Sequence, residues 1–125
     1  EAGIRKNAQA LKDAFAWNKG FREYFAVKAT PNPFVMNILR EYGCGYDCSS
    51  LTELMLSEAT GVQPRDIMFS SNDTPAEEFA YADKLGAIIN LDDITHIDCL
   101  EETLGHIPEI ISCRYNPGGL FKISQ

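Results

Sequence analysis

Three charged side chains, Lys28, Asp47 and Arg114, stand inside or at the end of short apolar runs of the sequence. Such a charge needs a partner or a function, because burying an unpaired charge is costly. Lys28 follows three apolar residues, 25–27, in a run expected to form a buried strand, and burial would favour its neutral amine. A neutral lysine amine can attack a carbonyl group and form a Schiff base. The alternative here is a lysine at a strand end whose amine reaches water.

A repeating pattern of strands and helices would position these residues. Five runs have the composition of buried strands: 24–29, 45–48, 66–70, 87–91 and 109–115. The first four start 21 residues apart and the fifth starts 22 residues later. Helical patterns lie between them, and an amphipathic helix over residues 4–17 precedes the first. Strands that alternate with helices of about 10 residues predict βα units and a parallel sheet.

The ends of the four intervening helices are marked by capping residues. The expected starts are Asn32 before Pro33, the capping boxes Ser50 to Glu53 and Thr74 to Glu77, and Asp92. Each helix is expected to stop at a glycine, namely Gly43, Gly61, Gly86 and Gly105.

The repeat of about 21 residues fits a barrel better than its alternatives. A leucine-rich solenoid would repeat an L-x-x-L-x-L strand, which is absent, and a dinucleotide-binding sheet would carry G-x-G-x-x-G after the first strand. A (β/α)₈ barrel needs eight units and about 250 residues. The 125 residues therefore predict a partial TIM barrel of about the first five strands. Residues 120–125 follow a turn-like stretch and show no cap, so we expect the chain to stop after the fifth strand.

Composition excludes several classes of partner. The chain is 45% hydrophobic and 23% charged, with a net charge of −7, so neither nucleic acid nor an anionic membrane is expected to bind. No apolar run approaches the 18 or so residues of a membrane span. Four cysteines and two histidines include no CxxC pair, so no metal site is predicted. Reduced thiols, and hence a cytoplasmic location, are expected.

The carboxyl ends of barrel strands are where chemistry gathers in this architecture. Each expected strand ends in polar residues, with Lys28 in the first, Asp47 in the second and Arg114 in the fifth. We expect these three charges to converge and to serve as each other's partners. Ser50, Asp73 and Asp92 are better explained as helix caps or loop residues.

Three motifs in order carry a family resemblance: Phe-Ala-Val-Lys-Ala at 25–29, Gly-Tyr-Asp-Cys-Ser-Ser-Leu-Thr-Glu-Leu at 45–54, and Cys-Arg-Tyr-Asn-Pro-Gly at 113–118. Residues of about 20–119 resemble the N-terminal, alanine-racemase-like barrel of the pyridoxal-phosphate-dependent fold-type III amino acid decarboxylases. Within that family the diaminopimelate decarboxylases are the most similar.

The resemblance implies a cofactor site and an activity. Lys28 matches the lysine that holds pyridoxal 5'-phosphate through a Schiff base. The other matching cofactor-pocket positions are Asp47, Ser50, Glu53 and Arg114, with Asp47 and Arg114 paired. The implied activity is decarboxylation of meso-diaminopimelate to lysine, in lysine biosynthesis, by a cytoplasmic homodimer.

The same resemblance implies that residues 1–125 are only part of a pyridoxal-phosphate-binding barrel domain. The phosphate-binding loop, the remaining strands and a C-terminal β domain would all follow Gln125. Chain 1–125 is therefore expected to be inactive by itself.

Departures from the family pattern leave the substrate open. Thr30 stands where the family usually has Asn, and residues 70–72 read Ser-Ser-Asn where diaminopimelate decarboxylases tend to have His-Gly-Asn. Decarboxylases of ornithine, arginine or carboxynorspermidine are the alternatives, although residues 116–118 favour diaminopimelate over ornithine. The absence of Tyr-Gly-His after the lysine argues against a racemase. A non-catalytic pyridoxal-phosphate-binding homeostasis protein, which has a comparable barrel and lysine strand, is the alternative from another class.

Overall fold

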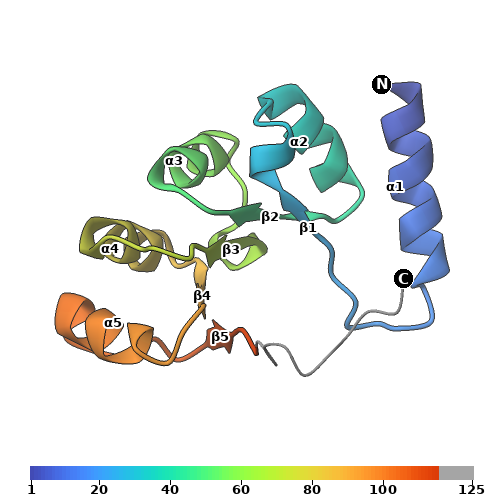
Figure 1. Cartoon of the computed structure of the whole chain (residues 1–125). Coiled ribbons are helices and arrows are strands. Elements are labelled where there is room, and N and C mark those ends of the chain that lie inside the picture. Colours follow the sequence, from blue (N-terminus) through green and yellow to red (C-terminus); the bar gives the residue numbers. More distant parts are fainter. Residues whose placement is uncertain (116–125) are drawn as a thin grey trace, which may run out of the picture.

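A single parallel sheet of five strands organises the computed structural model, which describes residues 1–115. The strands are β1 (Tyr24–Ala26), β2 (Gly45–Cys48), β3 (Ile67–Ser70), β4 (Ile88–Leu91) and β5 (Ile111–Cys113). They lie side by side in chain order, β1-β2-β3-β4-β5. Figure 1 shows them as a curved row with helices on its outer side. An unbroken chain order with outer helices is the arrangement of a barrel wall, so the predicted partial barrel is confirmed.

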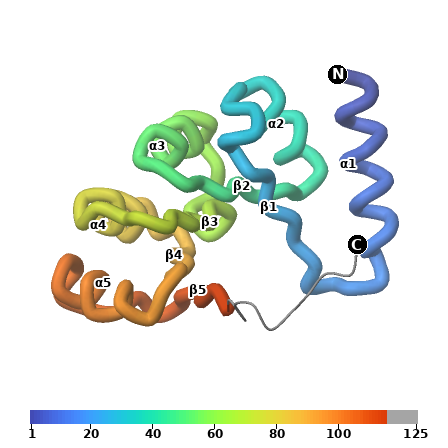
Figure 2. The backbone as a smooth tube through the Cα atoms, in the orientation of Figure 1, coloured from blue at the N-terminus to red at the C-terminus, as the bar shows by residue number. Residues whose placement is uncertain are grey.

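Five α-helices flank the strands: α1 (Ala2–Ala14), α2 (Pro33–Glu41), α3 (Leu51–Ala59), α4 (Ala76–Leu85) and α5 (His96–Leu104). Two short 3₁₀ segments, Val27–Ala29 and Pro64–Asp66, precede α2 and β3. The tube in Figure 2 shows each of the strands β1 to β4 leading into the helix that returns the chain to the next strand, with α1 beside α2. Within residues 1–115 no helix is long and apolar enough to cross a membrane.

Some predicted boundaries differ from the observed ones. The first helix begins at Ala2 and ends at Ala14 instead of spanning 4–17. Strand β5 covers three residues of the predicted 109–115, because its flanks leave the ladder with Ile89, Asn90 and Leu91. The predicted turn at 116–119 and the chain end at 120–125 lie outside the described residues.

The glycine stops are confirmed, but only some caps are. All four glycines have positive φ, 70° to 91°, a conformation that costs glycine little. The Asn32 side chain caps α2 by accepting from the backbone N–H of Phe34 at 2.9 Å. The Thr74 hydroxyl, by contrast, makes no hydrogen bond with a residue in the described range. At α5 it is Asp93, not the predicted Asp92, that accepts from the N–H of Thr95, at 2.9 Å.

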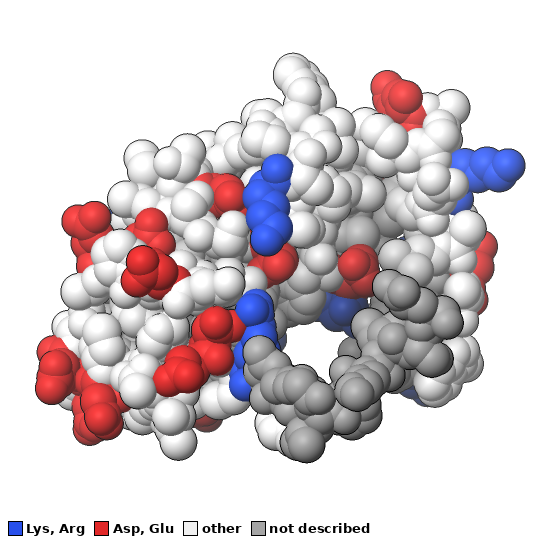
Figure 3. Space-filling view, viewed as in Figure 1, with Lys and Arg blue, Asp and Glu red and all other residues white. Residues whose placement is uncertain are grey.

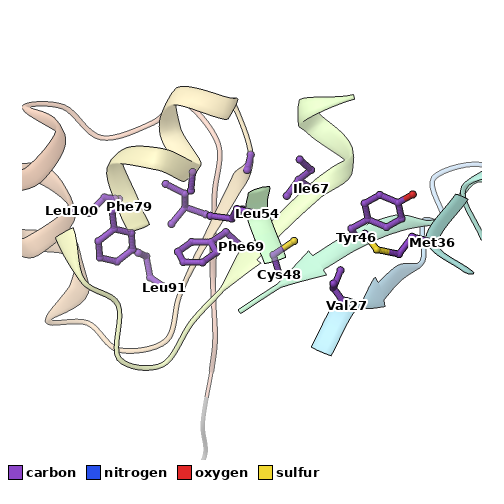
Figure 4. Packing of buried hydrophobic residues seen from close by; sticks show 13 residues of the cluster. Val27, Met36, Tyr46, Cys48, Leu54, Ile67, Phe69, Phe79, Leu91 and Leu100 are labelled. Carbon is purple, nitrogen blue, oxygen red and sulfur yellow. The ribbon is translucent and has the colours of Figure 1, made fainter. Parts of the chain in front are cut away.

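The core lies between the sheet and helices α2 to α5. Alternate strand residues, such as Tyr46, Phe69 and Ile89, are fully buried against the helices. Figure 4 shows Phe69 beside Phe79 of α4; their rings are nearly perpendicular, with centroids 6.4 Å apart. Because most of the apolar side chains use this outer face, polar side chains such as Asp47, Ser70 and Asn90 can occupy the opposite face of the strands.

Candidate functional site on the inner face of the barrel wall

Polar side chains from four neighbouring strands line the inner face. Ser70, Asn90 and Ser112 are in register across β3, β4 and β5, and Asp47 stands beside them on β2. An open cavity of about 330 Å³ lies over them. Its lining residues are Tyr24, Asp47, Met68, Ser70, Asn90, Ser112 and Arg114. Strand alternation explains this set, because inward positions recur every second residue.

A larger hollow lies elsewhere but offers less chemistry. It has a volume of about 440 Å³ between α1, α2 and β1, and apolar side chains such as Leu11, Phe25 and Leu39 line it. Glu23 is its one charged lining residue. We place the candidate site on the inner face because charged and hydrogen-bonding groups from several strands converge there.

Lys28 is not the buried strand residue that the sequence predicts. Strand β1 ends at Ala26, and Lys28 lies in the following 3₁₀ turn with its side chain exposed. In this turn Val27 is fully buried in the core between the sheet and the helices, and its carbonyl accepts from the N–H of Thr30 at 3.1 Å. The amine therefore stands at the carboxyl end of β1, as in the alternative of a strand-end lysine that reaches water.

Asp47 is half-buried and lies beside β1, since its register partner there is Ala26. Its carboxylate accepts a hydrogen bond from the hydroxyl of Ser70. In a second pair on the same face, a serine again donates to the preceding strand: the Ser112 hydroxyl of β5 donates to Asn90 Oδ1 of β4 at 2.8 Å. These hydrogen bonds link β2 to β3 and β4 to β5 across the inner face.

Arg114 contacts Asp92 and not Asp47, so the predicted Asp47–Arg114 pairing is wrong. Its Nη1 lies 2.6 Å from Asp92 Oδ1, and the two atoms form an ion pair without the angle of a hydrogen bond. The same Nη1 donates a hydrogen bond to Asn72 Oδ1 at 3.3 Å. Asp92 follows β4 and Asn72 follows β3, so the guanidinium connects the loops at the mouth of the cavity. Asp92 is accordingly an ion-pair partner and not a helix cap.

Ser50 and Glu53 organise the turn between β2 and α3. Ser50 Oγ accepts from the N–H of Glu53 at 3.4 Å, as a helix cap does. The Glu53 carboxylate accepts from the N–H of Ser49 at 2.8 Å, one residue before the cap. Both side chains are thus engaged in local hydrogen bonds, and neither lines the inner cavity.

Three residues that line the cavity, Ser70, Asn90 and Ser112, were not among the predicted site residues. Of these, Ser112 had the weakest signal in the sequence. It lies in the middle of β5 between Ile111 and Cys113, where neither charge nor a turn draws notice. The available signal was the alternation of side chains along a strand, because Ser112 occupies the inward position on β5 that Asn90 occupies on β4.

The cysteines and histidines form no metal centre in the described part of the chain. All four cysteines are free thiols. Cys48 is fully buried and lies 3.1 Å from the Ser57 hydroxyl, and burial raises the pKa of its thiol to about 12.

Comparison with known proteins identifies the family of this barrel wall. The family model for the pyridoxal-binding domain of the pyridoxal-dependent decarboxylases matches residues 1–118. The chain belongs to this family. The match covers all five strands, the inner cavity and Lys28.

Two curated relatives match most or all of the chain. Protein TabA of Pseudomonas amygdali pv. tabaci is 39% identical over 125 residues, which is 100% of this chain and 29% of TabA. Diaminopimelate decarboxylase of Thermoplasma acidophilum is 32% identical over 94% of this chain and 28% of that enzyme. The chain thus spans less than a third of the length of these relatives.

Solved structures of decarboxylases contain the same arrangement. Diaminopimelate decarboxylase of Helicobacter pylori, complexed with L-lysine, matches 81% of this chain and 26% of its own with a TM-score of 0.71 and 28% identity. Ornithine decarboxylase of Entamoeba histolytica matches 82% of this chain and 31% of its own with a TM-score of 0.74 and 30% identity. The five-stranded wall therefore matches the N-terminal barrel part of these decarboxylase structures.

Proposed function

We propose that the protein containing this chain is a pyridoxal-phosphate-dependent decarboxylase that converts meso-diaminopimelate to lysine. The observation that supports the proposal most is the family match over residues 1–118, which includes an exposed lysine at the carboxyl end of β1. Barrel enzymes gather their reactive groups at this end of the strands. The exposed amine of Lys28 is accessible to an aldehyde. Asp47, the register partner of Ala26 two residues before Lys28, lines the inner cavity.

The described residues fit part of a pyridoxal phosphate site. In the proposal Lys28 holds the cofactor covalently, and Asp47 presents a carboxylate to the cavity. Arg114, Ser50 and Glu53 take positioning roles, since their contacts fix the loops after β2 and β5. Pyridoxal phosphate, when bound, supplies an electron-poor ring that accepts the electron pair left when carbon dioxide departs.

The choice of substrate is supported by relatives and not by a residue of the cavity. Diaminopimelate decarboxylases occur among both the curated relatives and the solved structures. A site that pairs the distal carboxylate and ammonium of meso-diaminopimelate would leave buried groups unmatched with lysine or ornithine. Discrimination by such a site can reach about 10⁴-fold.

Ornithine is the second candidate substrate. Ornithine decarboxylase of Entamoeba histolytica has a TM-score of 0.74 and 30% identity to this chain. Ser70 also stands where the diaminopimelate enzymes tend to have His, which removes one argument for that group. A preference for ornithine would leave the proposed role of Lys28 unchanged.

The assay is release of carbon dioxide by the full-length protein, reconstituted with pyridoxal phosphate, from four amino acids at equal concentration. We expect meso-diaminopimelate to react much faster than ornithine, lysine or arginine. A preference for ornithine or arginine, or equal rates on all four, would overturn the diaminopimelate proposal. Tight cofactor binding without release of carbon dioxide from any of them would support a non-catalytic pyridoxal-phosphate-binding protein.

The proposal also includes a homodimer and a cytoplasmic location. Light scattering on the full-length protein tests the first, with a mass of two chains expected and a monomer as the opposing result. Fractionation of the source cells, with detection by antibody, tests the second.

A further inference from the structure

The geometry points to Ser70 as the positioning residue that orients the Asp47 carboxylate toward a protonated amine of a ligand bound in the cavity. This inference rests on the proposed function, since it assumes that the inner cavity receives pyridoxal phosphate and an amino acid. It adds a residue, Ser70, that was not among the predicted site residues.

The contact between these residues crosses two strands of the barrel wall. Asp47 on β2 and Ser70 on β3 both point to the inner face and line the same cavity. The Ser70 hydroxyl donates to Asp47 Oδ1. Both residues are half-buried, so water competes for this bond less than it would at the surface.

Neighbouring side chains cannot replace Ser70 in this role. The register partners of Asp47 are Ala26 on β1 and Met68 on β3, and neither side chain has a hydrogen to donate to a carboxylate. Within residues 1–115, Ser70 supplies the one side-chain hydrogen bond that Asp47 receives. Deleting its hydroxyl would free the carboxylate to rotate, because the terminal torsion of aspartate is broad.

The hydrogen bond leaves the chemistry of the carboxylate available. It occupies Oδ1, while Oδ2 makes no hydrogen bond with a residue in the described range. Arg114 does not neutralise the charge, since its guanidinium is paired with Asp92. Asp47 can therefore present Oδ2 and a negative charge to the cavity, and a protonated amine is the group that suits both.

The test compares Ser70→Ala, Ser70→Thr and Ser70→Cys with wild type and with Asp47→Asn in the full-length protein. The readouts are the dissociation constant for pyridoxal phosphate and the pH midpoint of the absorption band of the bound cofactor. We expect Ser70→Ala to weaken binding about five- to tenfold and to shift the midpoint in the same direction as Asp47→Asn. Ser70→Thr, which keeps a hydroxyl, should have a dissociation constant and a pH midpoint close to those of wild type.

Ser70→Cys is the fallback if the alanine variant fails to fold, because it keeps the volume but donates weakly. It should shift the midpoint toward the Asp47→Asn value. The matched control is Ser57→Ala. It removes a hydroxyl of α3 that is hydrogen-bonded to Cys48, whose side chain lies on the opposite face of β2 from Asp47. This control should leave the midpoint unchanged while lowering the thermal midpoint of unfolding.

The outcomes separate this inference from the proposed function. If Asp47→Asn shifts the midpoint and neither Ser70→Ala nor Ser70→Cys does, the positioning role is refuted and the cofactor site stands. If wild type binds no pyridoxal phosphate, the proposed function fails and this inference fails with it. A shift in Ser57→Ala as large as in Ser70→Ala would also refute the role, since any lost hydroxyl near β2 would then suffice.

Discussion

Arg114 and Asp92 form an ion pair between the residues that directly follow two adjacent strands. Arg114 Nη1 lies 2.6 Å from Asp92 Oδ1. The pairing follows from the ladder, because Leu91 and Cys113 are register partners and the next residue of each strand is the charged one. Asp47 is on β2, and two strands separate it from β5.

A double-mutant cycle with Arg114→Met and Asp92→Asn should give a coupling free energy of about 0.5–1 kcal/mol in urea unfolding. The value is modest because the two side chains are 46% and 22% exposed, so water screens the pair. The matched cycle with Asp47→Asn should give no coupling. Greater coupling to Asp47 than to Asp92 would contradict the observed contact.

Borohydride reduction of the full-length protein with pyridoxal phosphate should attach the cofactor to Lys28. Peptide mapping by mass spectrometry identifies the modified lysine. Lys28→Ala should abolish both the adduct and turnover, whereas Lys19→Ala, which alters an exposed lysine before β1, should retain them. An adduct on any other lysine would refute the assignment of Lys28 as the cofactor lysine.

The sequence could predict the strand order and most strand positions, since burial imposes a 21-residue pattern of apolar runs. It placed β2 at 45–48, as observed. It could not predict that β1 ends at Ala26, because the apolar run continues through Val27 while the backbone already turns. The Ser70–Asp47 bond was also beyond reach, because it depends on register between strands and not on spacing along the chain.

Gly45→Ala should lower the free energy of unfolding by about 2–4 kcal/mol. A Cβ at this position would lie 2.5 Å from the carbonyl oxygen of Asp66 and 2.7 Å from the Tyr24 ring. The control is Gly3→Ala in α1, where a Cβ meets nothing within 4 Å and helix propensity favours alanine. Urea unfolding measures the free energy of unfolding of both variants. Equal changes in the two variants would show that β1 and β2 can separate to make room for the methyl group without cost.

Stability should decrease above pH 9 because of Cys48. Its thiol has a pKa raised from 9.0 to about 12 by burial, so the unfolded chain loses this proton first. The contribution of the protonated thiol to the free energy of unfolding is complete below pH 9. It is lost as pH rises toward 12, by up to about 1.4 kcal/mol per pH unit. Cys48→Ala should therefore show a shallower decline in urea unfolding between pH 8 and 11. Identical slopes would show that the thiol titrates alike in both states.

The unbroken chain order of the five strands has a consequence for how the wall forms. Register partners in every ladder are only 20 to 22 residues apart. Each βα unit can dock on its predecessor by closing a loop of constant, short length, at a similar entropic cost each time. The wall can thus grow one unit at a time as a nascent chain leaves the ribosome.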